Sequence, residues 1–141
     1  MKLPDTNVLV NSFNEFSPFR HQAAKWLEKA FDSEAGVGLA WLTLVGFVSV
    51  STQQGILKTP LTPANALGLM DSWLLHPRAR ILHPTESHGD ILAKLLLVAG
   101  TAGNLTNDAH LAALSIEHDA TMGSFDKHFK KFPRIKLDLL V

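Results

Sequence analysis

The chain has 141 residues, of which 46% are hydrophobic, and its formal charge at neutral pH is zero. This size and composition predict one domain, residues 1–141, whose core needs no disulfides. The absence of cysteine excludes thiolate zinc sites and cysteine nucleophiles, and neutrality means that nucleic-acid binding must rest on a local patch. The sequence lacks a signal-peptide start and any run of about 20 apolar residues, so we expect a soluble, cytoplasmic protein without membrane contacts.

The first half of the chain alternates helical and extended patterns. After a short apolar opening, apolar side chains recur on a helical period over residues 17–32, which predicts an amphipathic helix. Residues 36–40 are β-prone and begin at a glycine, so we predict a strand that feeds a mostly apolar helix over residues 41–53. The Thr62-Pro63 pair is a helix start, with threonine as N-cap and proline at the first helical position, and His76-Pro77 ends that helix.

The second half repeats this alternation. One helix is N-capped by Thr85 or Ser87 and closed by Gly100, and the next carries Asp108 in its first turn, where the helix dipole favours an anion. The predicted elements are a strand at residues 79–82, helices at 85–100 and 106–118, and strands at 121–123 and 136–140. This strand–helix rhythm predicts an α/β fold with a parallel sheet, in which ligands bind beyond the carboxyl ends of the strands.

Three aspartates stand where a folding chain favours apolar residues. Asp5 follows the first strand, Asp126 follows a later one, and Asp108 lies at a helix N-terminus, so all three face one crevice if the sheet gathers them. Taken singly, Asp108 is also explained as a helix-start residue and Asp126 as a turn former, whereas Asp5 has no capping role if the strand runs straight into it. Partly buried carboxylates are costly unless paired or bound to a cation. Together they predict a cation site for Mg²⁺ or Mn²⁺.

Basic residues crowd the segment after Asp126. They would meet the phosphates of a ligand bound near that aspartate, and the candidates are Lys127, Lys130 and Arg134. The alternative is a solvated charged face that holds Phe129 and Phe132 inward.

Several blocks of the sequence resemble one known family. They are Asp5–Leu9, Trp41–Phe47, Thr101–Leu105, Asn107–Ala113 and Ser124–Asp126. In this order and spacing they resemble the PIN-domain ribonucleases, and in particular the VapC toxins of prokaryotic toxin–antitoxin pairs. The resemblance runs through almost the whole chain.

The resemblance implies a three-layer α/β/α sandwich with a central parallel sheet. It also implies the toxin component of a type II toxin–antitoxin pair: a Mg²⁺-dependent endoribonuclease that forms a homodimer and is neutralised by a cognate antitoxin. RNA would be hydrolysed by a metal-activated water, leaving a 5′-phosphate and a 3′-hydroxyl without a covalent protein nucleophile.

The family's site residues carry over position by position. Its catalytic, metal-binding acids match Asp5, Asp108 and Asp126. The polar neighbours of that site match Thr6, Asn7 and Ser124, of which Asn7 is expected to orient the first aspartate.

Two positions depart from the family pattern. A glutamate common in the helix after the second strand is Gly46 here, and an aspartate often found two residues after the last acid is His128. Each change removes a negative charge, so we expect weaker cation binding or a single well-held ion, with water or Thr43 filling the vacancy. A second hypothesis therefore stays open: a weak or inactive PIN-fold binding module that acts through antitoxin and dimer contacts. A phosphate-accepting receiver domain is a third, but it needs an acid pair beside the first strand, where only Asp5 is present.

We expect structural rather than catalytic roles for the remaining candidate residues. His110 lies two positions after Asp108 and points to a different helix face. The tryptophans lie on helical apolar stripes, and we expect core or dimer contacts rather than base stacking from Trp26, Trp41 and Trp73.

Overall fold

Five short strands form one sheet in the computed structural model, which describes residues 1–141. The strand order is β3-β2-β1-β4-β5, and every neighbouring pair is parallel. The strands are β1 (Lys2–Pro4), β2 (Val37–Leu39), β3 (Ala79–Ile81), β4 (Thr121–Ser124) and β5 (Lys136–Leu139). The predicted parallel sheet is confirmed.

Six α-helices and two short 3₁₀ helices connect the strands. The α-helices are α1 (Thr6–Phe13), α2 (Arg20–Asp32), α3 (Trp41–Ser51), α4 (Pro63–Leu74), α5 (His88–Ala99) and α6 (Thr106–Glu117). The 3₁₀ helices are η1 (Gly103–Leu105) and η2 (Lys127–Lys131). None of these helices combines the length and the apolar content that crossing a bilayer requires.

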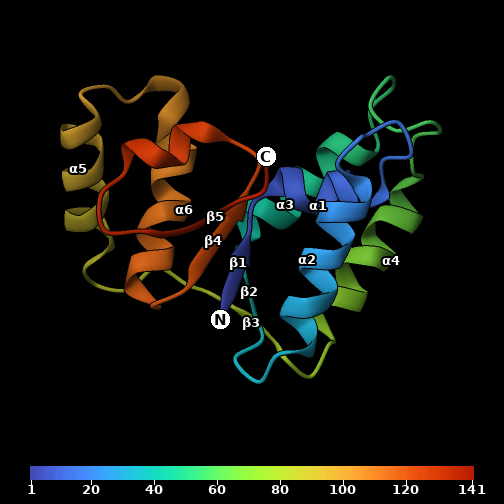
Figure 1. Cartoon of the computed structure of the whole chain (residues 1–141), viewed down its shortest axis with the longest axis horizontal. Helices are drawn as coiled ribbons and strands as arrows, with labels where there is room; N and C mark the ends of the chain where they lie inside the picture. The colour runs from blue at the N-terminus through green and yellow to red at the C-terminus, as the bar shows by residue number, and fades with distance from the viewer.

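The helices cover both faces of the sheet. Figure 1 shows α5 and α6 on one side and α1 to α4 on the other, with the strands between them. The buried side chains form two clusters: one includes Leu111 and Phe129 on the α5–α6 side, and the other includes Leu27 and Phe47 on the α1–α4 side. The molecule is therefore the three-layer α/β/α sandwich that was predicted. Phe129 and Phe132 both point inward, as expected for the basic segment.

A helix that the sequence did not reveal begins directly after β1. The helix α1 starts at Thr6, and Asp5 is its N-cap, because Asp5 Oδ1 accepts a hydrogen bond from the Thr6 N–H at 2.7 Å. The expectation that Asp5 has no capping role is therefore wrong. The next helix, α2, starts at Arg20 rather than Ser17, since Ser17 Oγ accepts the Phe19 N–H at 3.0 Å and holds a turn ahead of the helix.

The tryptophans divide between the core and the surface. Trp26 and Trp73 pack against the cluster on the α1–α4 side. Trp26 also donates from Nε1 to Asp138 on β5 at 3.0 Å. Trp41 is 44% exposed and is not a core residue.

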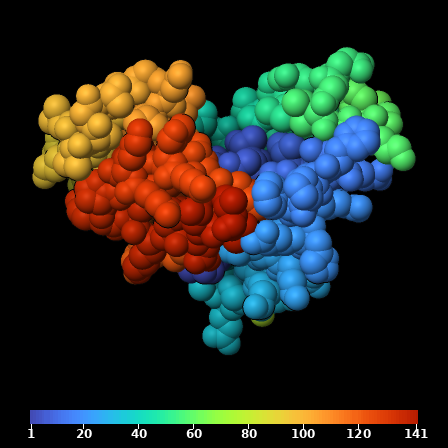
Figure 2. All heavy atoms as spheres, turned by 45° about the horizontal axis from the view of Figure 1, so that its top comes forward, coloured from blue at the N-terminus to red at the C-terminus, as the bar shows by residue number.

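The carboxyl ends of β1 and β4 lie side by side in the middle of the sheet, where Pro4 pairs with Gly123. After β1 the chain leads to β2 on one side, whereas the connection from β3 crosses through α5 and α6 to β4 on the other. The strand order thus reverses between β1 and β4, which is where open α/β sheets form a binding crevice. Figure 2 shows a hollow between the two helical sides, with the dark blue N-terminal residues at its floor.

Candidate active site

Asp5 lies at the carboxyl end of β1 and is only 8% exposed. Its Oδ1 accepts the Thr6 N–H, and its Oδ2 accepts the Ser124 hydroxyl at 2.8 Å and the Asn7 amide at 3.2 Å. Both carboxylate oxygens are therefore bonded to protein donors. Such bonds favour the ionised form of a buried carboxyl group and fix its orientation.

Ser124 and Asn7 join Asp5 to the segment that carries Asp126. The Ser124 hydroxyl donates to Asp5 and accepts the Asp126 N–H at 3.0 Å. Asn7 accepts the Phe125 N–H at 3.2 Å through its side-chain oxygen. These two neighbours of the first acid thus hold the end of β1 and the turn after β4 in one arrangement.

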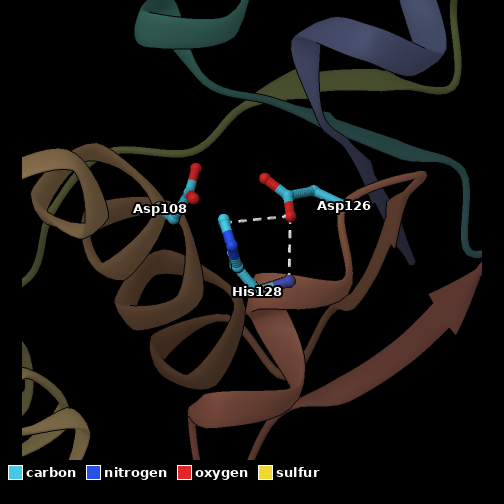
Figure 3. Close-up of side chains that lie close together, drawn as sticks. All are labelled: Asp108, Asp126 and His128. Carbon is cyan, nitrogen blue, oxygen red and sulfur yellow. Dashed lines mark hydrogen bonds and ion pairs between the residues drawn. The ribbon is translucent and has the colours of Figure 1, made fainter.

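Asp108, Asp126 and His128 point toward one another (Figure 3), and one ligand atom from each lies within 4.8 Å of the others. Asp108 lies in the first turn of α6. Asp126 caps η2, because its Oδ1 accepts the His128 N–H at 2.8 Å, and the same oxygen lies 3.3 Å from His128 Nδ1. The third member of this cluster is His128, and Asp5 lies outside it.

The three carboxyl groups nevertheless act on one another electrostatically. The pKa of Asp108 is raised from 3.8 to about 6, first by burial and then by the charges of Asp5 and Asp126. Burial also raises the pKa of Asp5; hydrogen bonds from Ser124 and Thr6 oppose that rise, and the charge of Asp126 adds to it. The fold therefore brings the three acids, from distant parts of the chain, to the carboxyl-terminal side of the sheet.

The donor set fits a divalent cation. Two carboxylates and an imidazole converge, and no lysine or arginine forms an ion pair with Asp5, Asp108 or Asp126. Carboxylate oxygens are the ligands that Mg²⁺ and Mn²⁺ prefer. A bound cation would favour the ionised carboxylates and so reverse the rise in the pKa of Asp108.

Gly46 lies against Thr6 rather than beside an open carboxylate position. A Cβ atom at Gly46 would be 2.7 Å from Thr6 Oγ1 and 3.2 Å from Thr6 Cγ2. The Thr6 hydroxyl in turn donates to the Thr43 carbonyl at 3.4 Å. The Thr6 side chain therefore lies in the space beside Gly46, and the buried Thr43 hydroxyl has no hydrogen-bond partner.

Lys127 and Lys130 lie on the 3₁₀ helix that follows Asp126, whereas Arg134 lies beyond it. Both lysines are exposed on η2, which begins immediately after Asp126, and neither forms an ion pair. Arg134 precedes β5 and lines a cavity with Asp119, which precedes β4. Because β4 and β5 are parallel, these two residues lie at the amino ends of the strands, whereas Asp126 lies at the carboxyl ends. We therefore remove Arg134 from the candidate RNA contacts.

The sequence motifs indicated His128 only as a lost negative charge, whereas the fold makes it a member of the cluster. The available signal was its position two residues after Asp126, in a turn that this aspartate caps. His110 behaves as expected and belongs to another cluster: its Nδ1 lies 2.9 Å from Nε2 of His88, whose Nδ1 contacts Glu117.

Comparisons with known proteins cover nearly the whole chain. The PIN domain family matches residues 2–135. Ribonuclease VapC37 of Mycobacterium tuberculosis is 40% identical over 138 residues, which cover 98% of this chain and 96% of that protein. Ribonuclease VapC33 of the same species is 34% identical over 136 residues, which cover 96% and 95%.

Solved structures show the same fold at lower identity. VapBC2 from Rickettsia felis, bound to a promoter DNA fragment, gives a TM-score of 0.66 at 20% identity and covers 97% of this chain and 96% of that one. FitAcB from Neisseria gonorrhoeae gives 0.65 at 19% identity, with the same coverage. The resemblance found in the sequence motifs is thus confirmed, and the chain belongs to the VapC ribonucleases of the PIN-domain family.

Proposed function

We propose that this chain is the toxin component of a type II toxin–antitoxin pair and acts as a Mg²⁺-dependent endoribonuclease. One observation carries the cleavage proposal: Asp108, Asp126 and His128 converge within 4.8 Å at the strand-order reversal, beside the clamped Asp5. The relatives that are 34% and 40% identical are named ribonucleases, which supports RNA as the substrate class.

Each acid has a separate task in this proposal. Asp108 and Asp126 hold the divalent cation, because their carboxylates converge and Asp108 accepts no protein hydrogen bond that lowers its pKa. Asp5 completes the acidic site as a fixed negative charge, since Ser124, Asn7 and the Thr6 N–H hold both its oxygens. When bound, the cation would supply charge neutralisation at the scissile phosphate and an activated water.

Lys127 and Lys130 are the proposed RNA contacts. They are exposed and directly follow Asp126, so their ammonium groups can meet backbone phosphates on either side of the scissile one. Contacts of this kind carry no base specificity and weaken as salt rises. Single-stranded RNA would lie in the hollow of Figure 2, where the unpaired RNA strand can spread around the acids.

A cognate antitoxin and a second copy of this chain are the proposed protein partners. VapBC2, a structure with the same fold, supports the first assignment through its own complex. Exposed apolar side chains offer surface for such contacts, and on α5 Leu97 and Val98 are 80% and 65% exposed.

The test is cleavage of single-stranded RNA by the purified protein with Mg²⁺ and with EDTA. We expect cutting in Mg²⁺ that leaves 5′-phosphate and 3′-hydroxyl ends, and none in EDTA. Asp108→Asn and Asp126→Asn should each lower the rate by at least about 100-fold, because each removes a charge that holds the cation. Asp90→Asn, an exposed aspartate on α5, is the matched control and should cut as wild type does. Full activity in both site variants would contradict the assignment.

The binding-module alternative draws on one observation, the Thr6 side chain in the space beside Gly46. With no carboxylate there, the site has one acid fewer than the family's common pattern. This alternative predicts intact RNA with and without Mg²⁺, while binding to the antitoxin is retained. The cleavage assay therefore separates the two functions directly.

A further inference from the structure

We propose that His128 is a direct ligand of the cation and gives this site a preference for Mn²⁺ over Mg²⁺. The inference rests on the proposed cation site and assigns a role to a position that otherwise represents only a missing charge.

The turn after β4 aims the His128 ring at the acids. Asp126 Oδ1 accepts the His128 N–H at 2.8 Å, which folds the chain back so that the ring returns toward the capping carboxylate. Nδ1 of the ring lies 3.3 Å from that same oxygen. Figure 3 shows the ring between the Asp108 and Asp126 carboxylates, and the three ligand atoms lie within 4.8 Å of one another. A single ion can therefore be reached by all three side chains.

The His128 ring is also free to bind. Its only polar partner in the protein is Asp126, and its side chain is 60% exposed. By contrast, His88 and His110 contact each other, and His118 contacts the His83 carbonyl. No other histidine belongs to the cluster of Asp108, Asp126 and His128. The ligand atoms that converge are thus two carboxylates and one imidazole.

This donor set distinguishes between cations. Mg²⁺ prefers oxygen ligands and gains little from an imidazole, whereas Mn²⁺ and later first-row ions accept nitrogen. An aspartate at position 128 would attract both ions through its charge. A neutral imidazole lacks this charge and attracts neither ion in that way. Its nitrogen atom, however, coordinates Mn²⁺ better than Mg²⁺. The preference therefore arises because Mg²⁺ binding is weakened more than Mn²⁺ binding.

The test is calorimetric titration of the full chain with Mn²⁺ and with Mg²⁺ separately. Against wild type, His128→Ala should weaken Mn²⁺ binding by about tenfold or more, with a much smaller change for Mg²⁺. His128→Asp should tighten Mg²⁺ binding and lower the ratio of Mn²⁺ to Mg²⁺ affinity. His21→Ala, an exposed histidine of α2, is the control and should change neither affinity. Thermal unfolding of each variant checks that the fold is kept.

A spectroscopic readout makes the ligand assignment independent of affinity. Electron spin-echo envelope modulation of bound Mn²⁺ should show ¹⁴N coupling in wild type and in His21→Ala, and none in His128→Ala or His128→Asp. Wild-type Mn²⁺ without ¹⁴N coupling, or an unchanged affinity ratio in His128→Ala, overturns the inference while Mg²⁺-dependent cleavage still supports the proposed function. Failure of both ions to bind wild type would instead overturn the cation site and the proposed function with it.

Discussion

Asp5 and Asp108 are both partly buried carboxylates, but the protein treats them differently. Asp5 is almost fully buried and receives three hydrogen bonds, from the Thr6 N–H, Ser124 and Asn7. Asp108 is more open, yet the charges of the other two acids act on it, and its pKa rises to about 6 in spite of its place in the first turn of α6. The helix dipole contributes about 0.3–1 kcal/mol to an anion there, so burial and repulsion outweigh it. A bound cation should therefore change the charge state of Asp108.

The contact between Thr6 and Gly46 predicts a strong coupling between these two positions. Gly46→Glu alone should lower the free energy of unfolding by about 1–3 kcal/mol, because the new Cβ meets Thr6 Oγ1 at 2.7 Å. Thr6→Ala removes both close atoms and leaves Thr6 Cβ at 3.6 Å, an ordinary contact. The double variant should thus recover most of the stability and bind Mg²⁺ more tightly than wild type, since it adds a carboxylate beside the site.

A double-mutant cycle by urea denaturation and Mg²⁺ titration measures this coupling. We expect an interaction free energy of about 1 kcal/mol or more. Thr6→Ser keeps the hydroxyl that lies nearest to the added Cβ, so it should rescue Gly46→Glu less well than Thr6→Ala does. Strictly additive effects of the two changes would show that the Thr6 side chain does not fill the position.

At the scale of elements, β4 and α2 meet at a position that admits only glycine. A Cβ atom at Gly123 would lie 2.3–2.8 Å from three ring atoms of Trp26. The indole cannot easily withdraw, because it is half-buried and its Nε1 donates to Asp138 on β5. Gly123→Ala should therefore destabilise the protein by about 1–3 kcal/mol in urea denaturation, through overpacking between the helix and the sheet.

Gly68→Ala is the matched control for this effect. Gly68 lies inside α4, and no atom lies within 4 Å of the Cβ position. The same substitution should here stabilise the protein by about 0.5–1 kcal/mol, because alanine loses less backbone entropy in a helix. Equal effects at both positions would mean that contact with Trp26 does not decide the cost.

The elements that the sequence predicted well are those with local signals. Thr62 caps α4 through the Asn65 N–H with proline at the first position, and Gly100 ends α5 with a left-handed φ of 75°. Such caps depend only on near neighbours. The helix α1 escaped prediction because β1 is three residues long and Asp5 both follows the strand and caps the helix. Its apolar residues therefore looked like a continuation of the opening run.

At the scale of the whole molecule, strand order decides which residues form the site. The sequence indicated that Asp5, Asp108 and Asp126 follow strands or start a helix, but it did not contain the order β3-β2-β1-β4-β5 that places β1 beside β4. It could not show that Ser124 would bond Asp5, which lies 119 residues earlier. The turn that brings His128 to the acids is local, whereas its approach to Asp108 depends on the packing of α6 against η2.

Because this topology brings the three acids together, the charge of Asp108 affects the free energy of unfolding of the whole protein. In EDTA, folding gathers three carboxyl groups that lie far apart in the unfolded chain, and the folded pKa of Asp108 rises from 3.8 to about 6. A raised carboxyl pKa gives stability that is fully present below the unfolded value and is lost as pH rises through the folded value. Asp108→Asn removes this loss. The variant should exceed wild type in free energy of unfolding at pH 7.5 by about 1 kcal/mol, a figure discounted because the side chain is partly exposed.

The pH profile separates repulsion from other effects of the substitution. The advantage of Asp108→Asn in EDTA should be constant above about pH 6, shrink as pH falls from there, and vanish below 3.8, where wild-type Asp108 is protonated in both states. An advantage that persists at low pH would come from packing rather than from charge.

A bound cation should reverse this difference in stability. Mg²⁺ or Mn²⁺ at about 100 times its dissociation constant should make wild type more stable than Asp108→Asn at pH 7.5, since it stabilises wild type by about 2.7 kcal/mol. Asp108→Asn cannot gain as much, because it lacks the Asp108 carboxylate. That carboxylate destabilises the folded protein without the ion but helps to bind the ion when it is present.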